Sequence, residues 1–201
     1  MFAREKNNME KEEQIKKLKL DLIQCQQCAL RGGCRAPVPG IGSYNATVFI
    51  CGEAPGSDED EKGEPFVGRC GQILRTVLNK FGYNKDNTYI SNIVRCRPKD
   101  NKFPGDSDLV ENCAKWVKRE IEIIKPKIIL TLGNQPLKYI LGGYGITKVR
   151  GNMMKFNDIP AMPTYHPSYV MRKDQMKDIE TRKNFEIDIE TISKNFLVQN
   201  G

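Results

Sequence analysis

The segment KIILTLG, residues 127–133, is apolar at nearly every position and ends on glycine. A strand without a polar face is typical of a parallel sheet that is covered by helices on both sides. The other strand-like segments are 47–52, 88–95 and 160–165, and the helix-like segments between strands are about 70–82, 108–124 and 134–141. This alternation predicts an α/β fold with three layers (α/β/α) around a central parallel sheet.

The length of 201 residues suits one domain with a sizeable core, and we expect residues 1–201 to form that single domain. In the N-terminal segment 1–24, apolar residues recur with the spacing of an amphipathic helix over 9–24. A loop rich in cysteine, glycine and proline follows at 25–35. The polar tail from about 173 to 197 is expected to be helical.

The chain carries 32 basic and 25 acidic residues, a net charge of +7. This balance favours a polyanionic partner, with nucleic acid ahead of an anionic membrane surface. No apolar run approaches the length of a membrane span, and the charged start MFAREKNN lacks the apolar core of a secretory signal. We therefore expect a protein that works inside the cell, in a reducing compartment.

Cysteines in a reducing compartment are better explained by a metal site or by buried thiols than by disulfides. Cys25 and Cys28 form a CxxC pair, in which two thiolates can converge on one metal. Cys96 follows a predicted strand and Cys113 lies in the next predicted helix, so these two can face each other. Four thiolates suit a structural zinc ion or a [4Fe–4S] cluster, and the spacing does not distinguish the two.

Three further cysteines have other expected roles. Cys34 competes as a ligand, because the segment CQQCALRGGC places it close to the CxxC pair. Cys51, in a predicted strand, and Cys70, at a predicted helix start, are expected to be buried as small apolar residues.

The loop GEAPGSDEDEKGEPFVGRCG, residues 52–71, joins a predicted strand to a predicted helix. A glycine-rich junction of this kind often holds a phosphate. Between Glu53 and Glu64, however, it carries six carboxylates and one basic residue, Lys62. This charge is wrong for a phosphate and suits a ligand that becomes positively charged.

Four pieces of the sequence together resemble the family 4 uracil-DNA glycosylases, the iron–sulfur type of bacteria and archaea. They are the loop 52–71, YISNIVRCRP at 89–98, HPSYVMR at 166–172, and the cysteines 25, 28, 96 and 113. The resemblance implies the three-layer α/β/α fold of that family and a [4Fe–4S] cluster held by those four cysteines. The sequence departs from the family pattern at Cys70, where alanine is usual. Cysteine and alanine are both small residues.

The resemblance also implies the reaction. The expected enzyme is a glycosylase that flips uracil out of single- or double-stranded DNA and hydrolyses its N-glycosidic bond, leaving an abasic site. It would be monofunctional, because no lysine in these motifs is placed to form a Schiff base with the sugar. In a related branch of the family, a histidine after the second motif traps the product covalently. Here the corresponding segment reads RPKDNKFPGDSD and contains no histidine, so the sequence does not indicate that branch. We expect a monomer in the prokaryotic cytoplasm, associated with the nucleoid and with other repair or replication proteins. The alternative is a non-catalytic metal-cluster protein of the same fold that binds DNA, associated with a polymerase.

Breaking the bond between uracil and deoxyribose makes the sugar cation-like and the base anionic, so the site needs negative charge near the sugar and donors near the base. By resemblance, Glu53 and Glu59 lie on the sugar side, with Glu53 preferred as the group that activates water. Phe66 is expected to stack on the base, and the Asn92 carboxamide to select it by accepting from N3–H and donating to O4. His166, the only histidine, is expected to bind the base and donate to O2 as a neutral imidazole. The turn against the base and sugar would consist of Gly52, Ala54, Pro55 and Gly56.

The segment after His166 is expected to contact DNA. Tyr169, Val170 and Met171 would enter the stack that the flipped base leaves, and Arg172 would bind a phosphate. Further expected phosphate contacts are Arg95, Arg97, Lys99, Lys148, Arg150 and Lys173.

Overall fold

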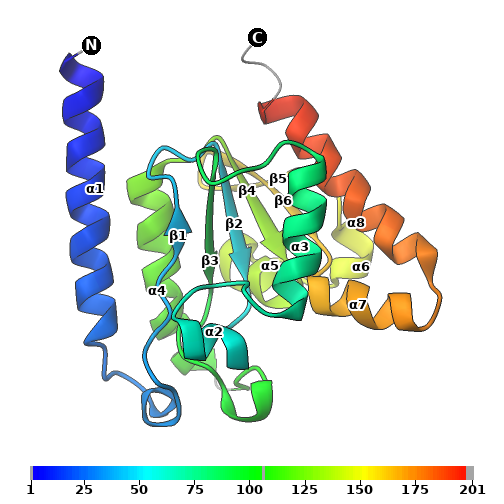
Figure 1. Cartoon of the computed structure of the whole chain (residues 1–201), viewed down its shortest axis with the longest axis horizontal. Coiled ribbons are helices and arrows are strands. Elements are labelled where there is room, and N and C mark those ends of the chain that lie inside the picture. Colours follow the sequence, from blue (N-terminus) through cyan, green and yellow to red (C-terminus); the bar gives the residue numbers. More distant parts are fainter. Residues whose placement is uncertain (1, 106, 198–201) are drawn as a thin grey trace.

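A computed structural model describes residues 2–105 and 107–197. It shows a six-stranded sheet with helices on both faces (Figure 1). The strands, in their order across the sheet, are β1 (Ile41–Gly42), β3 (Thr88–Asn92), β2 (Val48–Gly52), β4 (Ile128–Leu132), β6 (Ile159–Thr164) and β5 (Met154–Phe156). The predicted three-layer α/β fold is confirmed.

The four central strands, β3, β2, β4 and β6, run parallel, and the two short edge strands run antiparallel to their neighbours. Every residue of β2, β3 and β4 is buried, which explains why their sequences show no polar face. The pairing of β2 with β3 ends at Gly52 beside Asn92. The predicted strand 88–95 stops at Asn92, because the chain there turns across the end of β2: Ile93 and Val94 donate to the carbonyl oxygens of Gly52 and Glu53.

Helices α3 (Arg69–Lys80), α7 (Pro167–Gln175) and α8 (Ile179–Ile192) pack together over one face of the sheet (Figure 1). Helices α1 (Phe2–Ile23) and α4 (Ser107–Ile124) pack against each other on the opposite side. The remaining helices are α2 (Ser57–Lys62), α5 (Asn134–Leu141) and α6 (Ile146–Val149), with single helical turns at Ala29–Gly33, Lys99–Asn101 and Ser193–Leu197.

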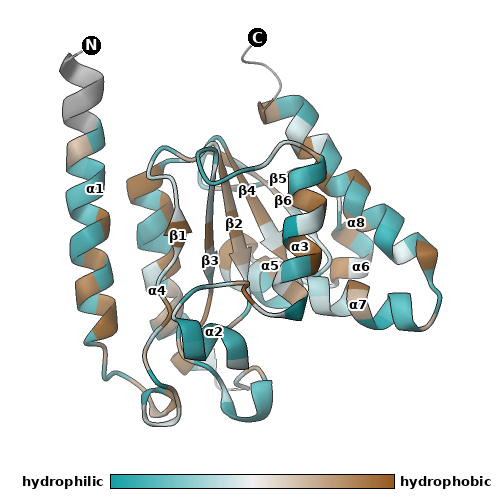
Figure 2. Cartoon of the chain, in the orientation of Figure 1, coloured by the Kyte–Doolittle hydropathy of each residue, from teal (hydrophilic) through white to brown (hydrophobic). Residues whose placement is uncertain are grey.

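The core consists of two apolar clusters, one on each face of the sheet. One joins Leu74 of α3 and Phe185 of α8 to the sheet, and the other joins Val117 of α4 and Ile15 of α1 to it. Figure 2 shows the strands as the most hydrophobic part of the molecule, with mostly hydrophilic outer helix faces. None of the described helices has the length and apolar character needed to cross a membrane.

The C-terminal part differs from the prediction of one helical tail. Helix α7 begins at Pro167, within the segment expected to be a loop, and a turn at 176–178 separates it from α8. The turn contains Lys177 at a positive φ of 59°, a conformation that interrupts a helix, and Asp178 then caps α8 by accepting from the Thr181 N–H at 3.2 Å. Two short helices therefore replace one.

Candidate active site

The loops that leave β2, β3 and β6 enclose a cavity of about 240 Å³ at the carboxyl ends of the strands. Ligands bind at this edge in most open α/β sheets, because parallel strands end there together. Of the residues expected to contact a nucleoside, those that line the cavity are Glu53, Ala54, Pro55, Gly56, Glu59, Phe66, Asn92 and His166.

Gly52 does not line the cavity but determines how closely its walls approach. A Cβ atom at this position would lie 2.4 Å from the Phe66 ring and 2.5 Å from Asn92 Oδ1. Phe66 itself has a positive φ of 57°, and its carbonyl oxygen accepts from Arg75 Nε at 3.1 Å. Its ring is tilted by 39° to that of His166, at 6.1 Å between centroids. The missing Cβ and the strained backbone together place an aromatic face in the cavity.

The side chain of Asn92 is 2% exposed and stands at the end of β3. Its Oδ1 has no hydrogen-bond partner among the described residues. A buried acceptor without a partner costs about 1–3 kcal/mol, so its retention calls for an explanation. Because the side chain lines the cavity, a ligand with an N–H donor would satisfy it.

The Glu53 carboxylate lies between the loop after β2 and the start of α5. Burial raises its pKa to about 7, although a hydrogen bond from the Gln135 backbone N–H and the charge of Arg172 favour the ionised form. Gly133 makes room for it: a Cβ there would lie 2.7 Å from Glu53 Oε1. This carboxyl group is therefore poised to exchange a proton near neutral pH.

Glu59 lines the same cavity, but its two carboxylate oxygens are already engaged. Oε2 accepts from the Gly56 N–H at 3.0 Å and Oε1 accepts from the Gly68 N–H at 2.8 Å. Glu59 thereby connects Gly56 and Gly68 within the acidic loop, residues 52–71, and caps α2. Of the two carboxylates expected near a sugar, Glu59 braces the loop with both of its oxygens, whereas burial raises the pKa of the Glu53 carboxyl group.

His166 is the N-cap of α7, and its Nδ1 accepts from the Ser168 backbone N–H at 3.2 Å and lies 2.8 Å from Ser168 Oγ. A backbone N–H can only donate, so Nδ1 carries no proton and the proton of the neutral ring is on Nε2. Burial, followed by the charge of Arg172, lowers the pKa of His166 to about 4. At neutral pH the ring is thus an uncharged Nε2–H donor.

A family profile for the uracil DNA glycosylase superfamily matches residues 39–190, the region that contains the sheet and this cavity. The chain belongs to the uracil DNA glycosylase superfamily. It is similar to type-4 uracil-DNA glycosylases of Sulfurisphaera tokodaii (38% identity, 82% of this chain and 79% of that protein), Archaeoglobus fulgidus (32%, 87% and 89%) and Thermotoga maritima (34%, 92% and 97%).

In this member of the superfamily, five cysteines gather beside the cavity-forming loops. Burial raises the pKa of Cys96, and the neighbouring thiols of Cys34, Cys113 and Cys28 raise it further. Burial likewise raises the pKa of Cys113, with a smaller contribution from Cys28 and Cys25. All seven cysteines of the chain are free thiols. The four thiols that the resemblance implies as cluster ligands therefore face a common region.

No group of three or more His, Cys, Asp or Glu side chains in residues 8–105 and 107–197 is arranged to hold a single metal ion. A [4Fe–4S] cluster takes four cysteine thiolates, and the four expected thiols come from three segments and influence one another's pKa, so the donor set matches that of such a cluster. Cys34 hydrogen-bonds with Cys96 and stays a competing ligand. Cys51 is fully buried, as predicted, whereas Cys70 is only half-buried and lines the cavity.

Of the four residues in α7 that were expected to contact DNA, Val170 was assigned wrongly. It is fully buried in the core cluster of its face, because the segment is a helix whose fourth residue points inward. Tyr169 and Met171 are half-buried and Arg172 is exposed. Tyr169 and Arg172 also line a second cavity of about 360 Å³, which shares Glu53 and His166 with the first.

The basic residues expected to contact phosphates differ in whether they are paired with a carboxylate of the protein. Arg95 is 1% exposed and paired with Glu120, so its assignment as a phosphate contact was wrong. Arg150 is paired with Asp188 and Lys173 with Asp178. Arg97, Lys99 and Lys148 keep exposed surface.

Several residues that shape the cavity were not predicted from the sequence. Ser168 orients the His166 ring, Arg75 holds the Phe66 carbonyl, and Gln135 donates to Glu53. Asn101 and Phe103, from the loop after Cys96, line the cavity. Only Ser168 had a local signal, its position two residues after His166, where a side chain can reach back to a helix cap.

Proposed function

We propose that this chain is a monofunctional uracil-DNA glycosylase that acts in base excision repair. It would flip uracil out of single- or double-stranded DNA and hydrolyse the bond between N1 and C1′, leaving an abasic site. The observation that carries the proposal is the unpartnered Oδ1 of Asn92 in a cavity that also presents an aromatic ring and a neutral imidazole donor. The type-4 relatives support the same substrate.

Each side of the flipped base finds a complementary group. Asn92 Oδ1 accepts from N3–H and its amide N–H donates to O4, whereas cytosine presents the opposite pattern at these atoms. The Phe66 ring stacks on the base, which contributes about 1–3 kcal/mol and little selectivity. The imidazole Nε2–H of His166 donates to O2, where negative charge grows as the bond breaks.

Glu53 serves the sugar side. Its ionised carboxylate stabilises the cation-like sugar and accepts a proton from the water whose oxygen bonds to C1′. The electron pair of the broken bond leaves with N1 of uracil. No lysine lines either of the two cavities in the described part of the chain, which is consistent with a monofunctional enzyme.

We propose that Cys25, Cys28, Cys96 and Cys113 hold a [4Fe–4S] cluster. When bound, the cluster supplies a cross-link between the N-terminal segment, the loop after β3 and α4. The loop after β3 also carries Asn101 and Phe103, so the cross-link would steady one wall of the cavity. A brown colour with stoichiometric iron and sulfide would support this, and bound zinc without sulfide would contradict it.

We also propose the cellular setting that this chemistry requires. Free thiols and a DNA substrate both suit the reducing cytoplasm of a prokaryotic cell, where the chain would act at the nucleoid as a monomer. Other repair or replication proteins would then take over the abasic product.

The proposal is tested with oligonucleotides that contain a single uracil, single- and double-stranded, followed by alkali to cleave abasic sites. We expect cleavage only at uracil, and none in the same oligonucleotides with cytosine. DNA binding without any cleavage would instead indicate a non-catalytic DNA-binding protein.

The matched variant is Asn92→Asp, whose carboxylate cannot donate to O4 and repels the forming anion. Single-turnover excision should fall about 10²–10³-fold. Asn152→Asp, at an exposed position outside the cavity, should leave the rate unchanged. Wild-type excision by Asn92→Asp would remove Asn92 from this role.

A further inference from the structure

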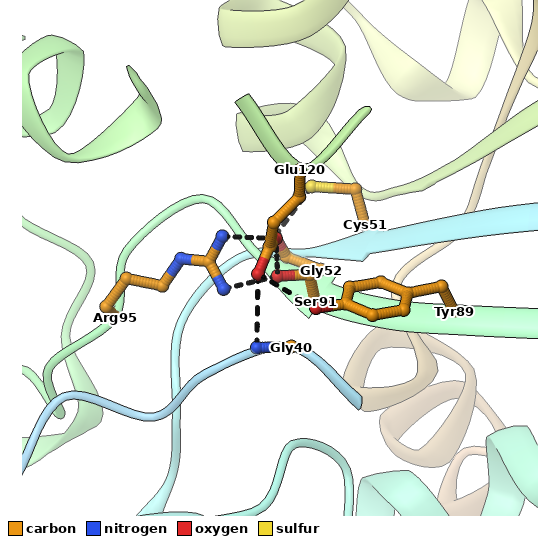
Figure 3. A network of polar contacts seen from close by, with 7 residues as sticks. All are labelled: Gly40, Cys51, Gly52, Tyr89, Ser91, Arg95 and Glu120. Carbon is orange, nitrogen blue, oxygen red and sulfur yellow. Dashed lines mark hydrogen bonds and ion pairs between the residues drawn. The ribbon is translucent and has the colours of Figure 1, made fainter. Parts of the chain in front are cut away.

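The carboxylate of Glu120, in α4, is the centre of a buried polar network (Figure 3). Its oxygens accept hydrogen bonds from the Gly40 backbone N–H at 3.3 Å, the Tyr89 hydroxyl at 3.3 Å, the Ser91 hydroxyl at 2.7 Å and the Arg95 guanidinium at 2.5 Å. The side chains of Glu120 and Arg95 are 2% and 1% exposed. The network does not line the cavity and has no role in the mechanism above.

Stabilisation of the fold does not by itself explain why the Arg95–Glu120 ion pair is buried. A buried pair of charges is often no more stabilising than apolar residues of the same volume, because removing both groups from water opposes their attraction. Arg95 Nε, moreover, has no hydrogen-bond partner within the described ranges, which adds a further penalty. The segments that the network connects give a better account of it.

Two of the connected segments are the loop with Cys96 and the helix with Cys113. Arg95 directly precedes Cys96, and its backbone N–H also donates to the Cys113 thiol. Glu120 lies seven residues after Cys113 in α4, which places both on the same helix face. The ion pair thus fixes the loop with Cys96 against the helix with Cys113.

The third segment is the N-terminal one. Gly40, which donates to Glu120, follows the cysteine loop 25–35. On the other side of that loop, α1 presents Lys19 over the Tyr89 ring, with its Nζ 6.0 Å from the ring centroid. Tyr89 in turn donates to Glu120. The chain on both sides of the cysteine loop therefore contacts this network, at Gly40 directly and at Lys19 through the Tyr89 ring.

We propose that Glu120 is a positioning residue for the cluster: it brings the three cysteine-bearing segments together before iron and sulfide bind. The inference rests on the cluster in the proposed function. A preorganised ligand set binds its metal faster and more tightly, because the chain does not have to be ordered at the moment of binding.

The experiment follows cluster assembly rather than excision. The iron-free, reduced chain receives ferrous iron and sulfide without oxygen, while bound iron and blue-region absorbance are recorded. Glu120→Gln should assemble the cluster more slowly than the wild type and bind iron about 10–100-fold more weakly, since the groups that orient metal ligands contribute that much to metal affinity. Circular dichroism should show wild-type helix content.

A second variant, Arg95→Met with Glu120→Met, removes both charges together, so neither remains buried without its partner. We expect it to fold and to assemble the cluster as slowly as Glu120→Gln. The matched control is Glu122→Gln on the same helix, where the carboxylate is 53% exposed and pairs with Arg119. This control should behave as the wild type.

The outcomes separate the two proposals. Wild-type assembly in the double variant, or loss of helix content in both Glu120 variants, would contradict the positioning role of Glu120. Neither result would contradict the proposal that the chain binds a cluster. If the wild-type chain itself binds no iron and sulfide, the cluster in the proposed function is refuted.

Discussion

Glu53 shows how the surroundings of a single side chain set its pKa. Burial favours its protonated form, while the Gln135 N–H and the Arg172 charge favour its ionised form, and the balance places its pKa at about 7. An exposed glutamate would be ionised throughout the physiological range but would be a weaker base. The acidic loop therefore supplies one carboxylate near the cavity with a raised pKa, whereas Glu59 in the same loop is bonded to backbone N–H groups.

The excision rate should follow the ionisation of Glu53. We expect kcat/KM to rise with pH and to level off above about 7, because only the ionised carboxylate accepts a proton from water. His166, with a pKa of about 4, stays neutral above pH 5 and adds no second limb there. Steady-state rates between pH 5 and 9 check this. In Glu53→Gln the remaining rate should be low and independent of pH; a rising limb that persists in this variant would assign it to another group.

The same group links stability to pH. Unfolded, Glu53 titrates near its ordinary pKa of 4.5, whereas folded it titrates at about 7. Between these values the folded chain holds a proton that the unfolded chain has lost, so the favourable contribution present below 4.5 is lost as the pH rises through 7. Glu53→Gln removes this loss. Its free energy of unfolding relative to wild type should increase by roughly 3 kcal/mol from pH 5 to 8 in urea titrations. A difference that does not change with pH would show that the pKa is not raised.

At the scale of elements, α7 combines in His166 a structural task, the helix cap, with the chemical task proposed for it. His166 caps the helix through Nδ1 and presents Nε2–H to the cavity. Asparagine is also a good N-cap, so His166→Asn should keep α7 while removing the imidazole donor. We expect thermal stability close to wild type with excision reduced about 10²–10³-fold. His166→Ala should lose excision and about 1 kcal/mol of stability as well. Equal stability of the two variants would show that capping is unimportant here.

The element boundaries show what local patterns reveal. The apolar runs predicted the four central strands, because strands buried on both faces have no polar positions. The edge strands β1 and β5, of two and three residues, are too short to show any periodicity. Val170 was misassigned because the motif was taken as a loop, whereas its position in a helix turns it into the core. The family motifs named most of the cavity lining but gave no direction for each side chain.

At the scale of the whole molecule, pairing across the sequence decides which charges are available. Arg95 and Glu120 are 25 residues apart, and Arg150 and Asp188 are 38 apart. No local pattern shows such partners, so composition overstated the number of free cations. The gathering of five cysteines from three segments is likewise a property of the fold, although the cysteine spacing gave its members in advance.

The remaining exposed cations lead to a prediction about DNA binding. Lys148 lies on α6, whose Ile146 and Thr147 line the second cavity, and Arg172 lines that cavity too. If both contact phosphates, binding to DNA releases counterions, and the logarithm of the affinity falls linearly with the logarithm of salt concentration. Removing one contact should make the slope shallower by about 1 and weaken binding equally for uracil-containing and uracil-free DNA.

The measurement is fluorescence anisotropy with a labelled oligonucleotide over a series of salt concentrations. Lys148→Ala and Arg172→Ala should each show the shallower slope. Lys194→Ala, whose lysine is exposed, paired with Glu190 and outside both cavities, should retain the wild-type slope. An equal slope in all four proteins would place the phosphates on another face. The cavity at the strand ends would then remain the proposed site for uracil. The next cations to substitute would be Arg97 and Lys99, which lie close to Cys96 in the sequence.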